Sequence, residues 1–217
     1  GERMKDIPFF PTEYGVASLG LQEIPYRKEA YIQILQAEQE NIPLLLEECG
    51  GFCKACGAEK IYWSGGTGDR ESALRLLRMT GTAWVDPSKL EQLFPVTNET
   101  VTQWREIYNR RMAHVPQSRT LSFVHEKEIL ESGGAYFVHH SGTLLGIGWL
   151  EGSSLLAIAS VQPGAGECVA HTLMSLAEGE QLSLEVLSCN QKAISLYERL
   201  GFLVTGMVRE WYEWPEK

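Results

Sequence analysis

Several features are scarce or missing in this 217-residue sequence, and each absence excludes a class of protein. No apolar run approaches the ~20 residues that a membrane-spanning helix requires. No positively charged start leads into an apolar stretch with a small-residue cleavage site, so we expect no secretory leader. The 19 Lys and Arg residues are outnumbered by 28 Asp and Glu residues and form no cluster, which disfavours a nucleic-acid partner. We therefore expect a protein that binds neither membranes nor nucleic acid.

Cysteine is also sparse, and its number is odd. Five cysteines cannot all pair within one chain, so we expect no complete disulfide framework and a cytoplasmic location. The formal net charge of -9 would attract cationic substrates such as amines, although it equally serves solubility, which we favour. With 44% hydrophobic residues, the chain can bury a substantial core as one large or two small domains.

Three of the cysteines have the spacing of the radical-SAM motif, in which three thiolates hold a [4Fe–4S] cluster: Cys49, Cys53 and Cys56. They also fall at positions i, i+4 and i+7 of a helical pattern, whereas that motif belongs in a loop after a first barrel strand. Ala55 stands where the motif usually has an aromatic residue. Cysteines are common buried residues. We therefore expect no metal site, and an iron–sulfur or other metal protein is kept as a remote alternative.

Two other motifs are discounted. The segment 65–68 is rich in glycine but lacks the Gly-Lys-Ser/Thr of a nucleotide-binding loop. His139 and His140 are adjacent on a predicted strand, so they point to opposite faces and cannot bind one metal together.

The N-terminal half alternates strand and helix patterns. Residues 16–21 and 30–36 are short apolar runs bounded by turn formers and predict strands. A helical pattern begins at Asn41 and ends at Gly57, and 61–63 predicts a further strand. Residues 72–78 predict a short helix, within a region extending to Pro87 that we identify as the linker.

The C-terminal half predicts a helix, a meander and two strand–helix units. The segment 97–100 supplies polar side chains for a helix start, and apolar residues recur at helical spacing to Met112. Strands at 136–140, 143–150 and 155–161 are separated by tight turns, as in an antiparallel meander. The next predicted elements are a helix that begins at 164–166, a strand at 182–187, a helix at 191–200 and a strand at 208–214.

Both halves share a strand–strand–helix–strand order, which suggests an internal structural repeat. In the first half, the segment 37–41 occupies the place before the helix, contains no glycine and carries two acids. Such a segment would repel a phosphate group, so any phosphate-binding loop is expected in the second half only.

One ordered motif in the second half combines a strand, an asparagine at its exit, a helix with an LYE triplet and a following Gly-Phe: Leu184-Glu185-Val186, Asn190, Ala193, Leu196-Tyr197-Glu198 and Gly201-Phe202. This motif resembles the C-terminal signature of the GNAT family of N-acetyltransferases. With the preceding meander and glycine loop, the resemblance covers roughly residues 90–214. The N-terminal third carries no such motif.

The resemblance implies a site for an acyl-CoA thioester, most simply acetyl-CoA. Two central strands would splay apart, with pantetheine pairing against the first strand's edge and the diphosphate lying on amides at the next helix start, which is a ready anion site. The cofactor-binding residues that it implies are Ala159, Ser160, Val161, Gln162, Gly164, Ala165, Gly166, Asn190 and Tyr197.

The loop departs from the family pattern in two ways. The usual loop is longer and carries an arginine before its glycines, which is absent here. Glu167 also places a negative charge beside the expected phosphates. Either difference would weaken CoA binding, and the alternative that Gly164 and Gly166 merely form a tight turn stays open.

Tyr197 and Glu185 are the catalytic candidates, with Tyr197 as the acid toward the leaving thiolate and Glu185 as the base toward the amine. A phenol with pKa ~10 is a weaker acid than a thiol with pKa ~8.5, so a hydrogen bond to the thiolate is as reasonable as full protonation. Strand alternation puts Leu184 and Val186 on one face and Glu185 on the other. A core role for Tyr197 and a solvated carboxylate for Glu185 remain the plain alternatives.

Three other side chains complete the set of candidates. Asn190 is expected both to cap the helix that follows it and, by the resemblance, to contact CoA. Glu151 and His139 are reserve candidates for the base, because strand ends of the meander can face an acceptor pocket.

Together these features predict an α+β fold, a GNAT-like mixed and mostly antiparallel sheet with helices on both faces. A smaller α/β N-terminal domain without a cofactor loop (1–86) precedes the acyltransferase domain (87–217). The predicted activity is acetyl transfer from acetyl-CoA to a primary amine by direct attack. The alternative is a catalytically degenerate CoA-binding or assembly module. The acceptor, a small molecule or a peptide amine, and a homodimer are left open.

Overall fold

The computed structural model describes residues 4–66 and 74–216, which form two compact units. The first unit comprises Gly1–Arg75 and Arg209–Lys217, and the second comprises Leu76–Val208. The helices are α1 (Ile24–Arg27), α2 (Ile42–Ala55), α3 (Val101–Met112), α4 (Glu126–Ser132), α5 (Gly166–Met174) and α6 (Gln191–Arg199). The strands are β1 (Ile7–Thr12), β2 (Gly15–Gly20), β3 (Glu29–Gln36), β4 (Lys60–Ser64), β5 (Leu74–Thr82), β6 (Gln92–Pro95), β7 (Ala135–His140), β8 (Thr143–Glu151), β9 (Ser154–Ser160), β10 (Gln181–Leu187) and β11 (Leu203–Trp214).

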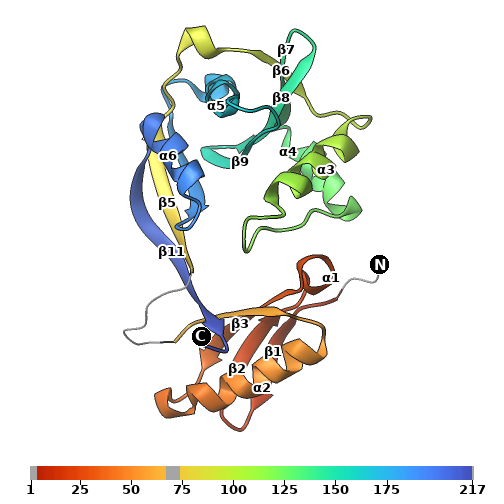
Figure 1. Ribbon diagram of the computed structural model, residues 1–217, viewed down its shortest axis with the longest axis vertical. Coiled ribbons are helices and arrows are strands. Elements are labelled where there is room, and N and C mark those ends of the chain that lie inside the picture. The colour runs from red at the N-terminus through yellow and green to blue at the C-terminus, as the bar shows by residue number, and fades with distance from the viewer. Residues whose placement is uncertain (1–3, 67–73, 217) are drawn as a thin grey trace. The chain divides into compact units, whose positions relative to one another are not determined.

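In the first unit, α2 lies across a sheet with the strand order β1-β2-β3-β4-β11 (Figure 1). β3 and β4 are parallel and joined by α2, whereas the other neighbours are antiparallel. α2 forms where the sequence predicts it, because its buried residues recur at helical spacing and Gly57, at φ +106°, ends it. Cys49 and Cys53 lie on this buried face of α2.

In the second unit, the strand order is β11-β5-β10-β9-β8-β7-β6. β9 and β10 pair in parallel, whereas the pairs β5–β10, β8–β9, β7–β8 and β6–β7 are antiparallel. α3 and α4 pack on one face of β7–β9, around Trp104, Ile129 and Ile147. α5 and α6 pack on the other face, around Leu173, Leu184 and Phe202 (Figure 1). The predicted α+β fold, with a mixed and mostly antiparallel sheet and helices on both faces, is confirmed.

The predicted meander is confirmed as β7, β8 and β9. Ser141 and Gly142 both have positive φ, at 47° and 83°, which is the backbone of a two-residue hairpin turn that follows strand twist. Gly152, at φ +60°, turns the chain between β8 and β9. The repeat is also present, since β2-β3-α2-β4 and β8-β9-α5-β10 each contain an antiparallel pair followed by a parallel crossover.

The helix and linker predicted between residue 72 and Pro87 are wrong within the described residues. Leu74–Thr82 is instead the strand β5, paired with β10 at seven consecutive register positions from Leu76 to Thr82. Residues 72 and 73 lie outside the described residues. The Leu, Arg and Met residues of β5 favour a helix locally. β5 lies between β10 and β11 in the sheet, however, and pairing with these strands overrides that preference.

Four further helices and strands are not predicted by the sequence patterns: β1, α1, β6 and α4. β1 and β6 contain prolines, which weaken a strand pattern, and α4 has only seven residues. α3 begins where predicted, but Thr100 accepts no hydrogen bond from the helix, so the predicted side-chain cap is wrong. Its hydroxyl instead accepts from the Thr97 amide, at 2.9 Å.

The boundary between the units differs from the predicted division at residues 86 and 87. Residues 76–86 belong to the second unit because β5 pairs with β10 there. Residues 209–217 belong to the first unit because the end of β11 pairs with β4, with Tyr212 opposite Trp63. Each unit therefore includes chain that the sequence assigns to the other domain.

The end of α6 follows the predicted Gly-Phe stop in detail. Gly201 has φ +93°, its amide donates to the Glu198 carbonyl, and the Phe202 amide donates to the Tyr197 carbonyl at 2.9 Å. This pair of bonds is the Schellman arrangement, which satisfies carbonyls that a helix end leaves free. Phe202 is completely buried and packs against Tyr197, with ring centroids 6.3 Å apart. The stop therefore fixes how α6 lies on the sheet.

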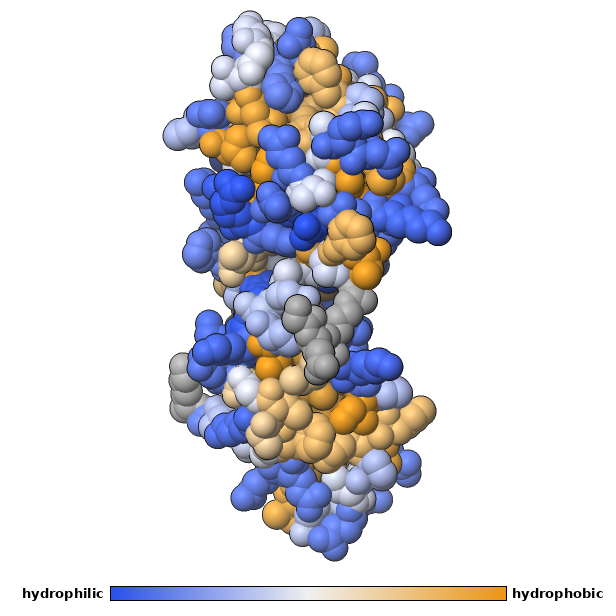
Figure 2. Space-filling view, turned by 90° about the vertical axis from the view of Figure 1, so that its right-hand side faces the viewer, coloured by the Kyte–Doolittle hydropathy of each residue, from blue (hydrophilic) through white to orange (hydrophobic). Residues whose placement is uncertain are grey.

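Hydrophilic and hydrophobic residues are interspersed over the face seen in Figure 2. Large apolar side chains that are exposed include Phe123, at 75%, and Leu203, at 69%. Among the described residues, no helix combines the length and the apolar character that crossing a bilayer would need.

The Phe202 packing predicts a large loss of stability on truncation. Phe202→Ala removes a fully buried ring and should lower the free energy of unfolding by about 3–5 kcal/mol. Its neighbour Leu203 is 69% exposed, so Leu203→Ala is the matched control and should change stability by less than about 0.5 kcal/mol. Urea unfolding of both variants measures the difference, and similar losses for the two would contradict this account.

Candidate functional site

The parallel strands β9 and β10 are paired at one end only. Their single register pair joins Ser154 to Ser183, and the Ser183 amide donates to the Ser153 carbonyl at 2.9 Å. Beyond this pair, no pairing between the two strands is recorded in the described residues. On their other edges, β9 pairs with β8 as far as Ser160 and β10 pairs with β5 as far as Leu187. The two facing edges therefore part toward the carboxyl ends of both strands.

The first unit contains the same arrangement in closed form. β3 and β4, the counterparts of β9 and β10 in the repeat, pair at five consecutive positions from Glu29 opposite Lys60 to Gln33 opposite Ser64. Their facing backbone groups are used by each other. The open strand pair is thus specific to the second half of the repeat.

The register of β9 decides which backbone groups face the opening. The Val161 amide donates to the Leu145 carbonyl of β8 at 2.8 Å. Because successive residues of a strand direct their backbone groups to opposite edges, Ala159 also faces β8, whereas Ser160 faces β10. Of the three strand residues implied by the resemblance, Ser160 is the one whose N–H and C=O are placed at the open edge.

The glycine loop leads from this edge directly to the start of α5. Gly164 has φ +76°, a conformation that favours glycine, and the Ala165 amide donates to the Gln162 carbonyl. Ala165 is the N-cap of α5 and provides no side-chain acceptor. The first amides of the helix, from Gly166 onward, have no carbonyl one turn earlier to bind. They form a group of donors at the positive end of the helix dipole.

The Glu167 carboxylate at this helix start is paired with two cations. Lys89, in the 3-10 turn Pro87–Lys89, lies 3.0 Å from Glu167, and Arg199, in the last turn of α6, lies 2.8 Å away. Hydrogen bonds from Arg199 and then Lys89 lower the pKa of Glu167. The pairing with Glu167 raises the pKa of Lys89. Lys89 and Arg199 thus bring two positive charges to the start of α5 from outside the loop, and both pair with the Glu167 carboxylate.

Tyr197 lies on the face of the sheet covered by α5 and α6. Its ring packs against the core that contains Leu184 and Phe202. Burial raises the pKa of Tyr197 to about 12, so its hydroxyl is protonated at neutral pH. Tyr197 is therefore suited to donate a hydrogen bond from the α6 side.

Glu185 lies on the opposite face of β10. Leu182, Leu184 and Val186 are buried beneath α5 and α6, so the alternation predicted from the sequence is confirmed. The Glu185 side chain is exposed, and its register partner on β5 is Arg78. Glu185 and Tyr197 are thus not brought into contact with each other. They approach β10 from its two faces.

Asn190 caps α6 as predicted. Its side-chain oxygen accepts a hydrogen bond from the Ala193 amide at 3.2 Å. The reserve candidates lie farther from the opening. Glu151 is opposite Ser154, at the closed end of β9, and His139 is on β7, where its ring packs against Phe94 and Phe137.

The cysteine motif lies in the first unit. Cys49 and Cys53 are completely buried in its core, and burial raises their pKa values to about 11 and about 12. Thiols in such surroundings hold their protons, whereas metal ligands are thiolates. His139 and His140 also have separate environments, since the His140 Nδ1 lies 2.8 Å from the Glu91 carboxylate.

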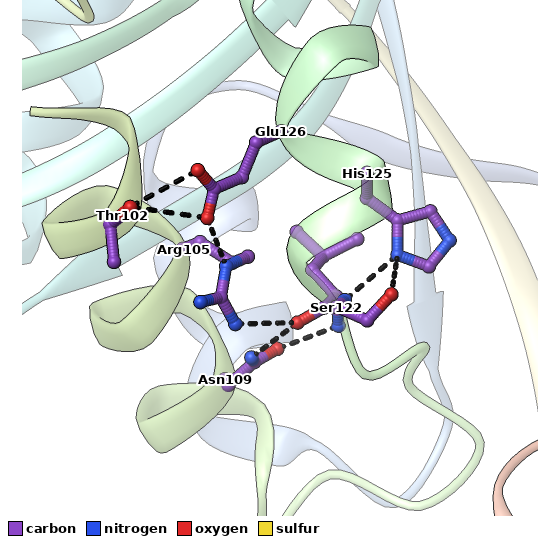
Figure 3. Close-up of polar contacts among 7 residues, drawn as sticks. Thr102, Arg105, Asn109, Ser122, His125 and Glu126 are labelled. Atoms are coloured by element: carbon purple, nitrogen blue, oxygen red, sulfur yellow. Dashed lines mark hydrogen bonds and ion pairs between the residues drawn. The ribbon is translucent and has the colours of Figure 1, made fainter. Parts of the chain in front are cut away.

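A polar network in the second unit joins α3, α4 and the segment between them (Figure 3). The buried Glu126 carboxylate accepts hydrogen bonds from Thr102 and from Arg105 Nε, at 3.0 and 2.8 Å. Arg105 and Asn109 both donate to the Leu121 carbonyl, and the Asn109 oxygen accepts from the Leu121 amide. The network fixes the α3–α4 segment on the same face of the sheet as Glu185.

Sequence reasoning misses Lys89, Arg199 and this network. Lys89 and Arg199 are 110 positions apart in the sequence and far from the glycine loop, so no local motif joins them to Glu167. Arg199 immediately follows the LYE triplet, in the last turn of α6, where a cation stabilises the helix end. This position is the sequence feature that could have drawn attention to Arg199.

Tyr197 predicts a loss of stability at alkaline pH. An unfolded tyrosine has pKa ~10, whereas folded Tyr197 has pKa about 12, so between these values the unfolded state binds fewer protons than the folded state. The free energy of unfolding therefore falls as pH rises through this window. Between pH 8 and pH 11, we expect wild type to lose ~1.4 kcal/mol more than Tyr197→Phe. Urea unfolding at both pH values measures this, and equal pH dependence of the two proteins would refute it.

Solved structures with a similar fold cover most of this chain. No family model and no curated protein matches the chain in sequence. A GCN5-related N-acetyltransferase from Kribbella flavida is 11% identical with a TM-score of 0.56, over 100% of this chain and 90% of that one. One from Sphaerobacter thermophilus is 14% identical with a TM-score of 0.53, over 91% and 76%. A tandem GNAT protein from the clavulanic acid biosynthesis pathway is 14% identical with a TM-score of 0.51, over 92% and 79%. The chain has the fold of the GNAT acetyltransferases.

Proposed function

We propose that this chain is an N-acetyltransferase that transfers an acetyl group from acetyl-CoA to a primary amine by direct attack. The observation that carries the proposal is the opening between β9 and β10 next to the free amides of α5. Because the equivalent strands β3 and β4 pair at five consecutive positions, the opening between β9 and β10 is not a general property of this sheet. One cofactor site per chain, in the second unit, follows from this contrast.

The chemical groups at the opening fit the parts of acetyl-CoA. Its diphosphate suits the amides of Gly166 and the next residues, because a helix start attracts anions. Lys89 and Arg199 add positive charge in place of the missing loop arginine. The backbone of Ser160 is positioned to pair with the amides of pantetheine. Asn190 is proposed to contact CoA while it caps α6. Bound acetyl-CoA would supply an activated thioester, and the acceptor remains a small-molecule or peptide amine.

Tyr197 is proposed to stabilise the leaving thiolate. With a pKa of about 12 against ~8.5 for a thiol, full proton transfer from Tyr197 is uphill by about 5 kcal/mol. A hydrogen bond from the phenol needs no such transfer and acts on charge that develops only in the transition state. Tyr197 therefore acts as a donor that keeps its proton.

Glu185 is proposed as the base for the incoming amine. An alkyl ammonium with pKa ~10.4 holds its proton at pH 7, so freeing the amine costs ~4.6 kcal/mol unless a nearby group accepts the proton. Glu185 is exposed on the face of β10 opposite Tyr197, so an amine could reach its carboxylate from solvent. The amine would therefore approach from the side of α3 and α4.

The most direct experiment combines calorimetry with an activity screen. Titration of acetyl-CoA into the full chain tests binding, and acetyl-CoA consumption against a panel of small amines, polyamines and peptides tests transfer. Binding together with turnover of an amine supports the enzyme. Binding with no turnover across the panel would favour a CoA-binding module, and no binding would reject the proposal.

Tyr197→Phe should separate catalysis from binding. Removing one donor to a developing charge costs about 10²-fold in kcat, whereas the ring and its packing remain, so the Kd for acetyl-CoA should change less than about twofold. Tyr136→Phe is the control, because its hydroxyl donates to the Gly133 carbonyl, away from the opening. Steady-state kinetics and calorimetry measure both quantities. Unchanged kcat would remove Tyr197 from the reaction.

Glu185→Gln should reduce kcat/KM for the amine by about 10²-fold, because the variant cannot accept a proton. The loss should shrink as pH rises toward the pKa of the amine, where free amine no longer needs a base. Glu180→Gln is the control, being an exposed carboxylate just before β10. Kinetics from pH 7 to pH 10 provide the test, and a loss independent of pH would argue for a structural role instead.

A further inference from the structure

Glu167 occupies an unusual place for a site that binds phosphates. It lies in the first turn of α5, and its carboxylate is held by Lys89 at 3.0 Å and by Arg199 at 2.8 Å. The two cations come from different elements, the 3-10 turn Pro87–Lys89 and the last turn of α6. Both are therefore already directed toward an anion that belongs to the chain itself.

The two ion pairs position Lys89 and Arg199, and they are weak enough for a ligand anion to replace the Glu167 carboxylate. All three side chains are partly exposed, at 36% for Lys89, 57% for Arg199 and 31% for Glu167. Ion pairs with this exposure contribute little net stability, because water and salt screen them. Lys and Arg also have long side chains that can change partners without moving the backbone.

We infer that Glu167 is an internal competitor of the acyl-CoA diphosphate, occupying Lys89 and Arg199 until the ligand displaces it and so weakening acyl-CoA affinity. The inference rests on the proposed function and concerns the same site. A diphosphate offers several charge-assisted acceptors, whereas Glu167 offers one carboxylate to the same two cations. When the ligand binds, Glu167 loses its partners and its negative charge remains beside the phosphates.

The surrounding charges do not offset this competition. Asp86 lies near Lys89 and adds a second negative charge, although its carboxylate is hydrogen-bonded to the amide and hydroxyl of Ser88. Among the described residues, Lys89 and Arg199 are the cations that pair with Glu167. An acid at this position also interacts favourably with the helix start, so it stabilises the ligand-free protein. That stabilisation is lost when a ligand anion replaces it.

The test is calorimetric titration of acetyl-CoA into wild type, Glu167→Gln and Glu178→Gln. Glu178 is an exposed acid beyond the far end of α5, so its substitution changes net charge equally and serves as the control. Glu167→Gln should bind acetyl-CoA about 3–10-fold more tightly at low salt, and this gain should shrink at high salt because the repulsion is screened. Glu178→Gln should match wild type, and Lys89→Gln should bind about 3–10-fold more weakly.

The ligand 3′-dephospho-CoA identifies the phosphate concerned, since it keeps the diphosphate and lacks the other phosphate. The gain in Glu167→Gln should persist with this ligand, and its loss would overturn the inference. Equal or weaker binding of acetyl-CoA by Glu167→Gln, with wild type binding normally, would likewise overturn it and leave the proposed function standing. Absence of binding by every protein in the series would reject both.

Discussion

The organisation of the second unit depends on two parallel strands, β9 and β10, that pair at one register position and then part. β9 and β10 each have one edge fully paired, with β8 and with β5, so both strands are held firmly while their facing edges diverge. Backbone donors and acceptors on those edges need partners, which an extended ligand with its own amides can provide. Because the chain leaves β9 at Ser160 and enters α5 at Gly166, the free edge and the free helix amides are close neighbours in sequence. One local departure from sheet pairing thereby places two kinds of binding group together.

The internal repeat allows the closed pair to be compared with the open one. β3 and β4 carry large buried side chains such as Ile32 and Trp63, whereas the corresponding part of β9 carries the small residues Ala157 and Ala159. The loop before α2 contains no glycine, and Pro43 occupies the first turn of that helix. Proline removes an amide from the group that would face an anion. The same topology is therefore used once as a closed structural element and once as an open one.

Features that depend on neighbouring residues were predictable from the sequence, whereas contacts between elements distant in the sequence were not. The Asn190 cap, the Gly201-Phe202 stop and the outward face of Glu185 follow from residues within one turn or one strand, so patterns are sufficient. β5 was predicted to be helical because its residues have helical preferences, and only its position between β10 and β11 makes it a strand. Lys89 and Arg199 could not be assigned to Glu167, since their meeting depends on the packing of two elements against α5. The loop itself contains no arginine, and the cations near the start of α5 come from outside the loop.

In the proposed reaction, the two faces of β10 divide the proton chemistry. Tyr197 is partly buried on one side, and its raised pKa keeps the phenol protonated, so the proposed role is to stabilise charge without supplying a proton. Glu185 is exposed on the other side, where water can carry away a proton that it accepts from an amine. A departing thiolate with pKa ~8.5 takes its proton from water at neutral pH, so no buried acid is required to complete the reaction. An acyl group lying between β9 and β10 could be reached from both faces at once, so the proposed transfer does not require Tyr197 and Glu185 to touch each other.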